Sequence, residues 1–201
     1  MTTGNPPREK PAHAAQKHFP VVDNELRIGG EPVTALAERA GGRAFYAYDG
    51  AVMRERVAAL RGMLPPGVEL HYAMKANPMP AVVDHLAGLT DGLDVASAGE
   101  LATALATGTD PLDISFAGPG KSEEDLAAAV AAGVIIILES PKELERVAAL
   151  APGAAVTPRV AVRVNPDFEL KASGMKMGGG PRPFGIEIGR ESCRERVCHR
   201  V

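Results

Sequence analysis

The sequence predicts an α/β fold built on a parallel sheet, and three observations support this class. Short apolar segments alternate with longer segments of helical periodicity, beginning near Arg43 and repeating six times with short connections. The segment 134–138 is wholly apolar, which is typical of a strand covered on both faces. Ser122 precedes three acidic residues, a pattern that indicates the start of a helix.

The expected elements follow in chain order. An extended piece at 26–28, a Gly-Gly turn and a helical run at 32–40 come first. Asn77 is the expected N-cap of a helix that has Pro78 in its first turn, and Ser140 with Glu143 predicts a capping box. The predicted strands are 44–48, 70–74, 93–96, 114–117, 134–138 and 160–164. The predicted helices are 51–63, 78–89, a segment that ends at Thr107, and two segments that follow Ser122 and Ser140.

Periodicity alone does not choose between a doubly wound sheet and a barrel. No Gly-x-Gly-x-x-Gly follows the first predicted strand, which argues against a dinucleotide site. The glycine-rich run 174–181 lacks the Gly-Lys-Ser/Thr ending of a phosphate-binding loop. We interpret this run as a loop over the mouth of the sheet or barrel.

Composition excludes several classes of protein. Apolar residues make up 45% of the 201 residues, which is enough for a core, while aromatic residues make up 4% and tryptophan is absent. A net charge of -3 gives no reason to expect nucleic acid or an anionic membrane as a partner. No apolar run approaches the ~18 residues of a membrane span, and the polar start is unlike a secretory signal. We therefore expect a cytoplasmic location.

The cysteines and histidines predict no metal site. Cys193 and Cys198 both lie in the last nine residues, and their spacing fits no common zinc pattern. A disulfide between them is not expected in a cytoplasmic chain. His13, His71 and His85 show no partner spacing, and the sequence assigns them no role.

Two linked motifs carry the functional prediction. Tyr-Ala-Met-Lys-Ala-Asn-Pro, at 72–78, places Lys75 where an apolar strand ends. A buried ammonium is costly unless it is paired or has lost its proton, and a neutral lysine amine is a nucleophile suited to Schiff-base chemistry. Asp-Val-Ala-Ser-Ala-Gly-Glu-Leu follows at 94–101.

These motifs resemble those of the fold-type III pyridoxal-phosphate-dependent decarboxylases, the ornithine/diaminopimelate/arginine decarboxylase family. The resemblance covers about 45–186, including Phe-Gly-Ile at 184–186. It implies a (β/α)8 TIM-type barrel of the alanine racemase-like fold, with pyridoxal 5'-phosphate as cofactor. Within the family, the segment 163–181 resembles the subgroup linked to exosortase systems.

The resemblance assigns five residues to the site. Lys75 is the expected catalytic residue, bound to the cofactor as a Schiff base; a surface lysine at a strand end is the alternative. Asp94 is expected near the cofactor, and the alternative is a turn residue. Ser97 and Glu100 are also expected near the cofactor, although Ser-x-x-Glu is equally a capping box. Arg163 is expected to face the cofactor, with an ion pair inside the barrel as the alternative.

The chain is expected to divide into four parts. These are a disordered tail at 1–19, a segment at 20–42 that belongs with the family's β domain, a partial barrel at 43–188, and an atypical tail at 189–201. We interpret this last tail as non-native sequence, and a real basic tail is the alternative. A complete barrel needs about 250 residues. The barrel is therefore expected to be truncated after about six strands. We expect this chain alone to show no decarboxylase activity, because the later cofactor-binding segments of the family have no match in it.

The predicted function is decarboxylation of an amino acid of the diaminopimelate or ornithine type. An intact member of the family is expected to be a homodimer. Two alternatives of the same fold stay open. One is a non-catalytic protein that binds or buffers pyridoxal phosphate, although such proteins usually lack the segment matching 94–101. The other is an amino-acid racemase, although Pro78-Met79-Pro80 replaces the run that normally follows its lysine motif.

Overall fold

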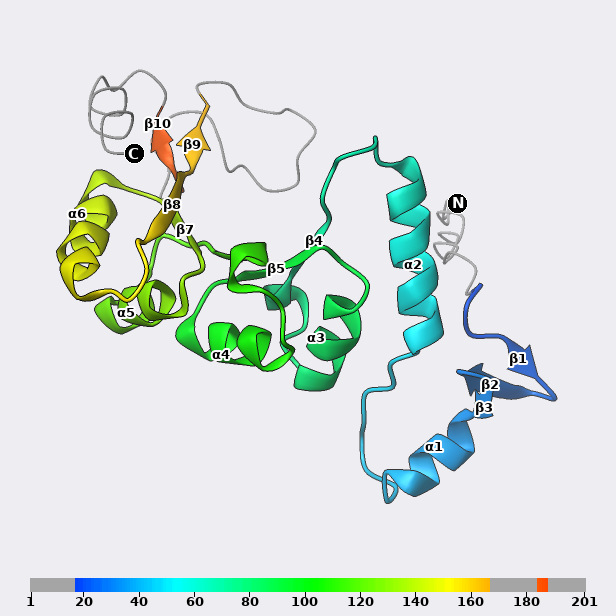
Figure 1. Cartoon of the computed structure of the whole chain (residues 1–201). Coiled ribbons are helices and arrows are strands. Elements are labelled where there is room, and N and C mark those ends of the chain that lie inside the picture. Colours follow the sequence, from blue (N-terminus) through cyan, green and yellow to red (C-terminus); the bar gives the residue numbers. More distant parts are fainter. Residues whose placement is uncertain (1–16, 167–183, 188–201) are drawn as a thin grey trace, which may run out of the picture. The chain divides into compact units, whose positions relative to one another are not determined.

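The computed structural model describes residues 17–166 and 184–187 (Figure 1). The chain divides into two compact units after Leu60, and each unit is described by itself. The predictions made for 1–16, for the loop at 174–181 and for the tail at 189–201 lie outside the described residues.

The first unit contains a small antiparallel sheet of three strands, β1 (Val21–Val22), β2 (Glu25–Ile28) and β3 (Glu31–Pro32). Asp23 and Asn24 join the first two strands with φ angles of 52° and 61°, the left-handed geometry of a tight two-residue hairpin. Helix α1 (Val33–Arg39) follows. The extended piece, the Gly-Gly turn and the helical run predicted here are confirmed.

The strand predicted at 44–48 was wrong, because this segment forms no regular element. A strand needs a neighbour to receive its hydrogen bonds, and no described segment pairs with 44–48. Tyr46 and Tyr48 instead stack at the surface, with ring centroids 6.4 Å apart. Helix α2 (Gly50–Met63) then follows Asp49, whose carboxylate accepts the Ala51 N–H at 2.8 Å.

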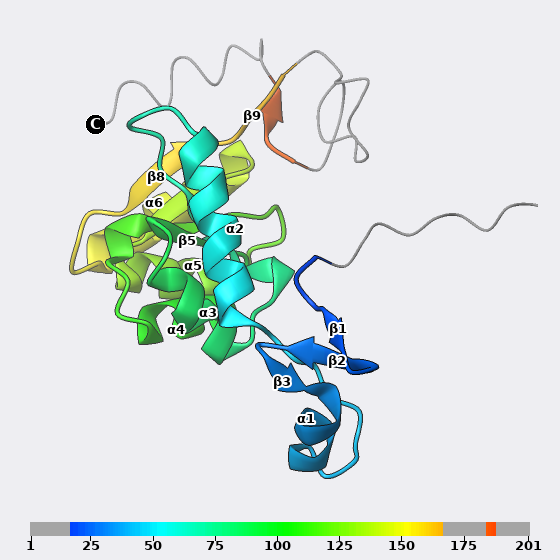
Figure 2. The same cartoon turned by 90° about the vertical axis from the view of Figure 1, so that its right-hand side faces the viewer.

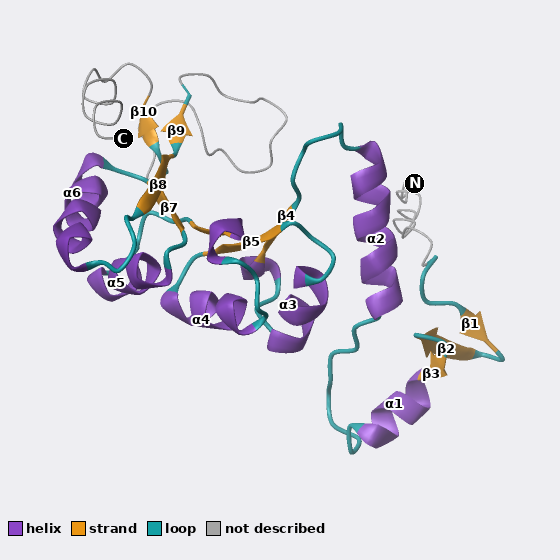
Figure 3. Cartoon of the chain, in the orientation of Figure 1, coloured by secondary structure: helices purple, strands orange, loops and turns teal. Residues whose placement is uncertain are grey.

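The second unit is built on a parallel sheet in the order β4-β5-β6-β7-β8. A helix follows each of the strands β4, β5, β6 and β7, so the predicted α/β alternation is confirmed. Figure 3 shows α3, α4 and α5 along one side of the strands. The strands are β4 (His71–Ala73), β5 (Gly92–Val95), β6 (Ile114–Phe116), β7 (Ile135–Leu138) and β8 (Arg159–Val162). The helices are α3 (Pro80–Ala87), α4 (Ala98–Ala106), α5 (Glu123–Ala132) and α6 (Pro141–Leu150), with 3-10 turns η1 (Met74–Ala76), η2 (Pro111–Asp113) and η3 (Ala151–Gly153).

The strand predicted at 160–164 is interrupted at Arg163. Beyond it, β9 (Val164–Asn165) continues the direction of β8, as the turned view of Figure 2 shows. Strand β10 (Ile186–Glu187) pairs with β9 in parallel, with Ile186 opposite Val164. The segment 184–187 therefore extends the parallel arrangement at the carboxyl end of β8.

The core lies between the sheet and its helices. Side chains alternate between the faces of a strand, so every second residue points toward the helices. In the central strands β5, β6 and β7 that face is buried, whereas the opposite face carries the half-exposed Asp94 and Ser115. The buried strand residues are Leu93, Val95, Ile114, Phe116, Ile136 and Leu138, and they pack with Val83, Leu101, Leu126, Ala129 and Val147 of the helices.

Serine caps start three of the four helices that cover the sheet. Ser122 and Asp125 form a complete capping box at α5, and Ser140 accepts the Glu143 N–H at α6. The N–H bond from Ser122 to its carboxylate is the main cause that holds the pKa of Asp125 below its ordinary value. These capping interactions fix where each chain segment turns back from the strand ends.

The cap predicted at Asn77 was wrong, because α3 begins at Pro80 with Met79 as N-cap. A residue before proline is disfavoured in helical geometry. Asn77 precedes Pro78 and Met79 precedes Pro80, and both adopt extended backbone angles. The Asn77 side chain accepts the Met79 N–H at 3.1 Å and so orders the turn before the helix.

Candidate functional site

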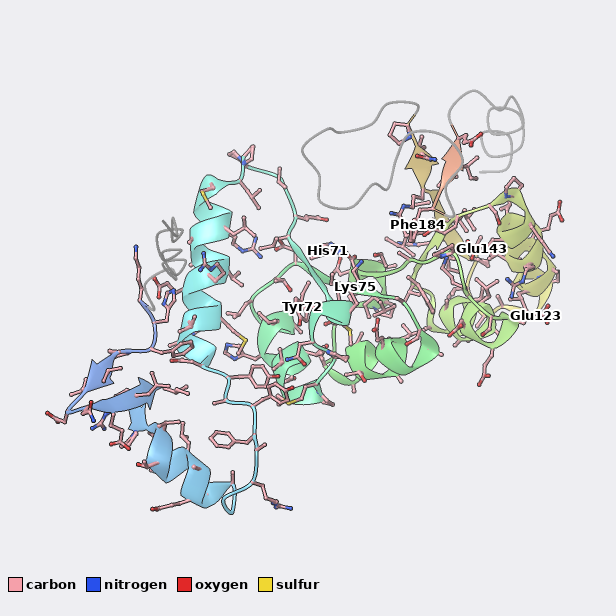
Figure 4. The ribbon with its side chains drawn as sticks, turned by 180° about the vertical axis from the view of Figure 1, so that it is seen from behind. His71, Tyr72, Lys75, Glu123, Glu143 and Phe184 are labelled. Atoms are coloured by element: carbon pink, nitrogen blue, oxygen red, sulfur yellow. The ribbon has the colours of Figure 1, made fainter. Side chains whose placement is uncertain are left out.

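The carboxyl ends of the five parallel strands gather polar side chains at one edge of the sheet, where active sites of this architecture form. Lys75 follows β4, Ser97 follows β5, Glu139 follows β7 and Arg163 follows β8. Figure 4 labels Lys75, His71 and Tyr72 near β4, and Phe184 and Glu143 at the other end of this unit. The polar groups fall into two clusters, described in turn.

Lys75 lies in the 3-10 turn η1 directly beyond β4. Met74 beside it is fully buried, and the Tyr72 hydroxyl donates to the Asn77 carbonyl at 3.0 Å, which holds the turn on both sides of the lysine. The Lys75 side chain itself is exposed, at the end of the strand, and its expected Schiff-base role stays a prediction. In the described part of the chain no ion pair holds its amine.

Asp94 lies on the open face of β5, opposite Ala73 of β4 and Ser115 of β6. The Ser115 hydroxyl donates to Asp94 Oδ1 at 2.5 Å, and His71 Nδ1 lies 3.5 Å from the same oxygen. No role was expected for His71, whose partner becomes visible only through the register of the strands. These contacts orient the Asp94 carboxylate from both neighbouring strands.

Gly92 makes room for the His71 ring. A Cβ atom at Gly92 would lie 2.5 Å from His71 Cε1 and 2.2 Å from the Asp113 carbonyl oxygen. Real Cβ contacts are not this close, so no other residue fits without displacing the imidazole or the backbone. The glycine at the start of β5 therefore allows His71 to lie beside Asp94.

Ser97 and Glu100 act as helix caps. Ser97 Oγ accepts the Glu100 N–H at 3.2 Å, and Glu100 Oε2 accepts the Ala96 N–H at 2.7 Å. The capping interpretation of the Ser-x-x-Glu pattern is thus confirmed, with the carboxylate bound one residue before the N-cap. Their expected contact with the cofactor stays a prediction.

The second cluster joins Arg163 to a residue that sequence reasoning missed. Glu139 is buried directly after β7, and its Oε1 atom lies 3.1 Å from Arg163 Nη1. The ion pair considered as an alternative for Arg163 is therefore present. The Arg163 guanidinium also lies over the Phe184 ring, 5.0 Å from its centroid. A carboxylate at the end of an all-apolar strand was the available signal for Glu139.

A buried ion pair between Lys121 and Glu143 lies beside this cluster. The side chains of Lys121 and Glu143 are 1% and 5% exposed, and Lys121 Nζ lies 3.1 Å from Glu143 Oε1. The same ammonium donates to the carbonyls of Gly118 at 2.8 Å and Ile137 at 2.7 Å. Lys121 thus fixes the turn between β6 and α5.

The two clusters are not linked to each other by hydrogen bonds or ion pairs among the described residues. Among the residues that the structure describes, no hydrogen bond or ion pair joins Lys75 to Asp94, or either of them to Arg163. Within the same ranges, no three His, Cys, Asp or Glu side chains are grouped to hold a metal ion. No helix in those ranges is long and apolar enough to cross a membrane.

A parallel α/β unit with polar side chains at its strand ends belongs to the class that binds small molecules at that edge. Residues 51–198 match the family described as pyridoxal-dependent decarboxylase, pyridoxal binding domain. The chain belongs to this family, and its cofactor is pyridoxal phosphate.

Individual relatives agree with this assignment. The chain is 40% identical over 160 residues to L-glutamyl-[BtrI acyl-carrier protein] decarboxylase of Niallia circulans, a match covering 77% of the chain and 36% of the relative. It is 36% identical over 179 residues to diaminopimelate decarboxylase of Aquifex aeolicus, covering 86% and 41%. The structure of Helicobacter pylori diaminopimelate decarboxylase complexed with L-lysine matches with a TM-score of 0.65 and 28% identity, covering 76% and 40%. The chain thus spans well under half the length of these relatives.

Proposed function

We propose that this chain binds pyridoxal phosphate through Lys75 and forms the cofactor-binding part of an amino-acid decarboxylase. The observation that carries the proposal is the position of Lys75. Its exposed amine lies directly beyond β4, at the edge where Asp94 and Arg163 are held by their own partners.

The residues at this edge suit the chemistry of a pyridoxal group. A lysine amine is the group that binds an aldehyde carbon covalently. Arg163 offers a permanent positive charge, and Asp94 offers a carboxylate whose orientation is fixed by Ser115. When bound, pyridoxal phosphate supplies the electron sink for loss of a carboxylate as CO2.

In this proposal each residue has a distinct task. Lys75 would hold the cofactor through its side-chain amine. Asp94, held by Ser115, presents a fixed negative charge at the strand ends. Arg163 presents a fixed positive charge two strands beyond β6. Ser97 and Glu100 order the turn between β5 and α4, which keeps the backbone at this edge in place.

The proposed substrate is an amino acid with a second charged group, of the diaminopimelate or ornithine type. The names of the relatives support this class, since both the Aquifex and Helicobacter proteins are diaminopimelate decarboxylases. The Niallia relative acts on a glutamyl group carried by a protein, which makes a carrier-bound amino acid the second candidate. The resemblance to the exosortase-linked subgroup, the homodimer and the cytoplasmic location are part of the same proposal.

The first test is reduction of the protein with borohydride in the presence of pyridoxal phosphate, followed by peptide mapping. We expect the label at Lys75, with loss of that label in Lys75→Arg. Lys142→Arg, which changes an exposed lysine of α6, is the matched control and should keep the label. Label spread over surface lysines with none selectively at Lys75 would refute the proposed site.

The second test measures CO2 release from carboxyl-labelled meso-diaminopimelate, L-ornithine and a glutamyl-loaded carrier protein. Because this chain alone is expected to release no CO2, the assay uses a chain extended to the full length of its relatives. Release that depends on Lys75 supports decarboxylation and ranks the substrates. Selective label at Lys75 with no release from any of them by the extended chain would favour a non-catalytic pyridoxal-phosphate-binding protein.

A further inference from the structure

We propose that Glu139 is a positioning residue that fixes the Arg163 guanidinium and holds the segment 184–187 against the strand ends. The inference rests on the proposed function, because Arg163 is one of the residues proposed to contact the cofactor. Glu139 itself lies in neither sequence motif and directly follows β7.

The Glu139 carboxylate receives donors from three separate segments. Its Oε1 atom accepts the Gly118 N–H at 2.9 Å and lies 3.1 Å from Arg163 Nη1. Its Oε2 atom accepts the Gly185 N–H at 2.8 Å. We call Glu139 and its three partners, Gly118, Arg163 and Gly185, the Glu139 clamp. The clamp joins the turn after β6, the junction of β8 and β9, and the segment before β10.

Burial makes this arrangement specific. The Glu139 side chain is 3% exposed, and a buried carboxylate is costly unless each oxygen receives hydrogen bonds. Both oxygens are satisfied only when Gly118, Arg163 and Gly185 occupy their observed places. The carboxylate therefore favours one position of the guanidinium over the many that a long arginine side chain can adopt.

The segment 184–187 fits around Arg163. The Ile186 N–H donates to the Arg163 carbonyl at 2.8 Å, and the Phe184 ring lies against the guanidinium. Gly185 has a φ of 77°, and a Cβ there would lie 2.9 Å from the Arg163 carbonyl oxygen. Glycine is thus required at this close approach. Docking of the segment and placement of the guanidinium are coupled.

The clamp is also tied to the buried ion pair. The Gly118 N–H donates to the Glu139 carboxylate, and the Gly118 carbonyl accepts from the Lys121 ammonium. Two side chains of opposite charge therefore hold the two backbone groups of one residue. Glu143, the partner of Lys121, in turn accepts the Glu139 N–H at 2.8 Å. The backbone of Glu139 is therefore fixed as well as its side chain.

Amide exchange without cofactor tests the clamp directly. Glu139→Gln keeps the shape of the side chain but removes its charge and one acceptor oxygen. We expect the Gly118 and Gly185 amides to exchange at least about tenfold faster, the lower range for a lost hydrogen bond to a charged group. Amides of β6 and α5 should be unchanged, which shows that the variant folds. Glu145→Gln, an exposed change on α6, is the control.

Cofactor binding tests the role of Arg163. The label trapped at Lys75 is measured as a function of pyridoxal phosphate concentration. In Glu139→Gln, the concentration that gives half-maximal label should be about tenfold higher than in the unaltered chain. In an Arg163→Lys background the same change should add less than about twofold, because the two residues act as one unit. A merely structural Glu139 would have equal effects in both backgrounds, and that result would overturn the proposal.

The outcomes separate the two proposals. If the unaltered chain takes no label at Lys75, the proposed function fails, and amide exchange alone decides whether the clamp exists. If Gly185 exchange is unchanged in Glu139→Gln, the clamp is wrong, whatever the label shows.

Discussion

Replacing Lys121 by methionine removes one partner of the buried ion pair while keeping the length and volume of the side chain. The ammonium serves two backbone carbonyls and both oxygens of Glu143, at 2.7 to 3.2 Å. With side chains 1% and 5% exposed, water cannot replace these contacts without opening the turn.

The magnitude follows from the charge that is left behind. Removing one member of a buried, hydrogen-bonded pair costs about 3–5 kcal/mol, because the other charge stays buried. Glu143 keeps the Glu139 N–H as a donor, which places Lys121→Met at about 3 kcal/mol, the lower end of that range. In Lys121→Met/Glu143→Leu the uncompensated charge is gone, so the loss should be smaller than the sum of the two single losses.

Urea unfolding followed by far-ultraviolet circular dichroism measures these differences from the shift in midpoint. Lys142→Met, an exposed change nearby in sequence, is the control and should stay within about 0.5 kcal/mol of the unaltered chain. A loss below about 1 kcal/mol for Lys121→Met would contradict the reasoning, since that value is typical of an exposed pair.

Three further outcomes are expected. Phe116→Ala, at a fully buried position of β6, should lower the free energy of unfolding by about 3–5 kcal/mol in the same assay; a loss under about 1 kcal/mol would argue against the described core. Gly92→Ala should lower the melting temperature, because its Cβ would meet the Asp113 carbonyl at 2.2 Å; an unchanged melting temperature would contradict the packing of His71. Hydrogen bonds from Arg61 hold the pKa of Asp91 below its ordinary value of 3.8, so its stabilisation is present above pH 3.8 and lost as the pH falls through the lower folded-state pKa. Asp91→Asn should reduce the decrease in the free energy of unfolding at acid pH. An unchanged pH dependence would refute the assignment.

The sequence predicted the regular elements of the second unit well, because local signals determine them. Ser122 and Ser140 mark helix starts through a side chain and a backbone group three residues away. Helix α3 begins later than predicted because Pro78 and Pro80 both disfavour helical geometry in the residue that precedes them. The turn at Asn77 therefore continues to Pro80. The strand expected at 44–48 failed because a strand depends on a neighbour that local pattern does not reveal.

The polar contacts of the site were harder to predict. Lys75 and Arg163 could be named from sequence, but Glu139 meets backbone groups 21 and 46 residues away, which carry no side-chain signal. His71 reaches Asp94 only because the register sets Ala73 opposite Asp94 and because Gly92 leaves space. Such contacts follow from the sheet geometry and become visible once the strands are paired.

Gly118 is held through its backbone groups alone, and this has a consequence for redesigning the substrate specificity of the site. The charged side chains of Glu139 and Lys121 hold this turn through the N–H and the carbonyl of Gly118. The conformation of the turn therefore depends little on the exposed residues that follow, Pro119 and Gly120. Those two positions can be randomised in a library while the flanking Gly118 and Lys121 keep the turn in shape. Variation could thus be introduced at the strand-end edge at little cost to the core beneath it.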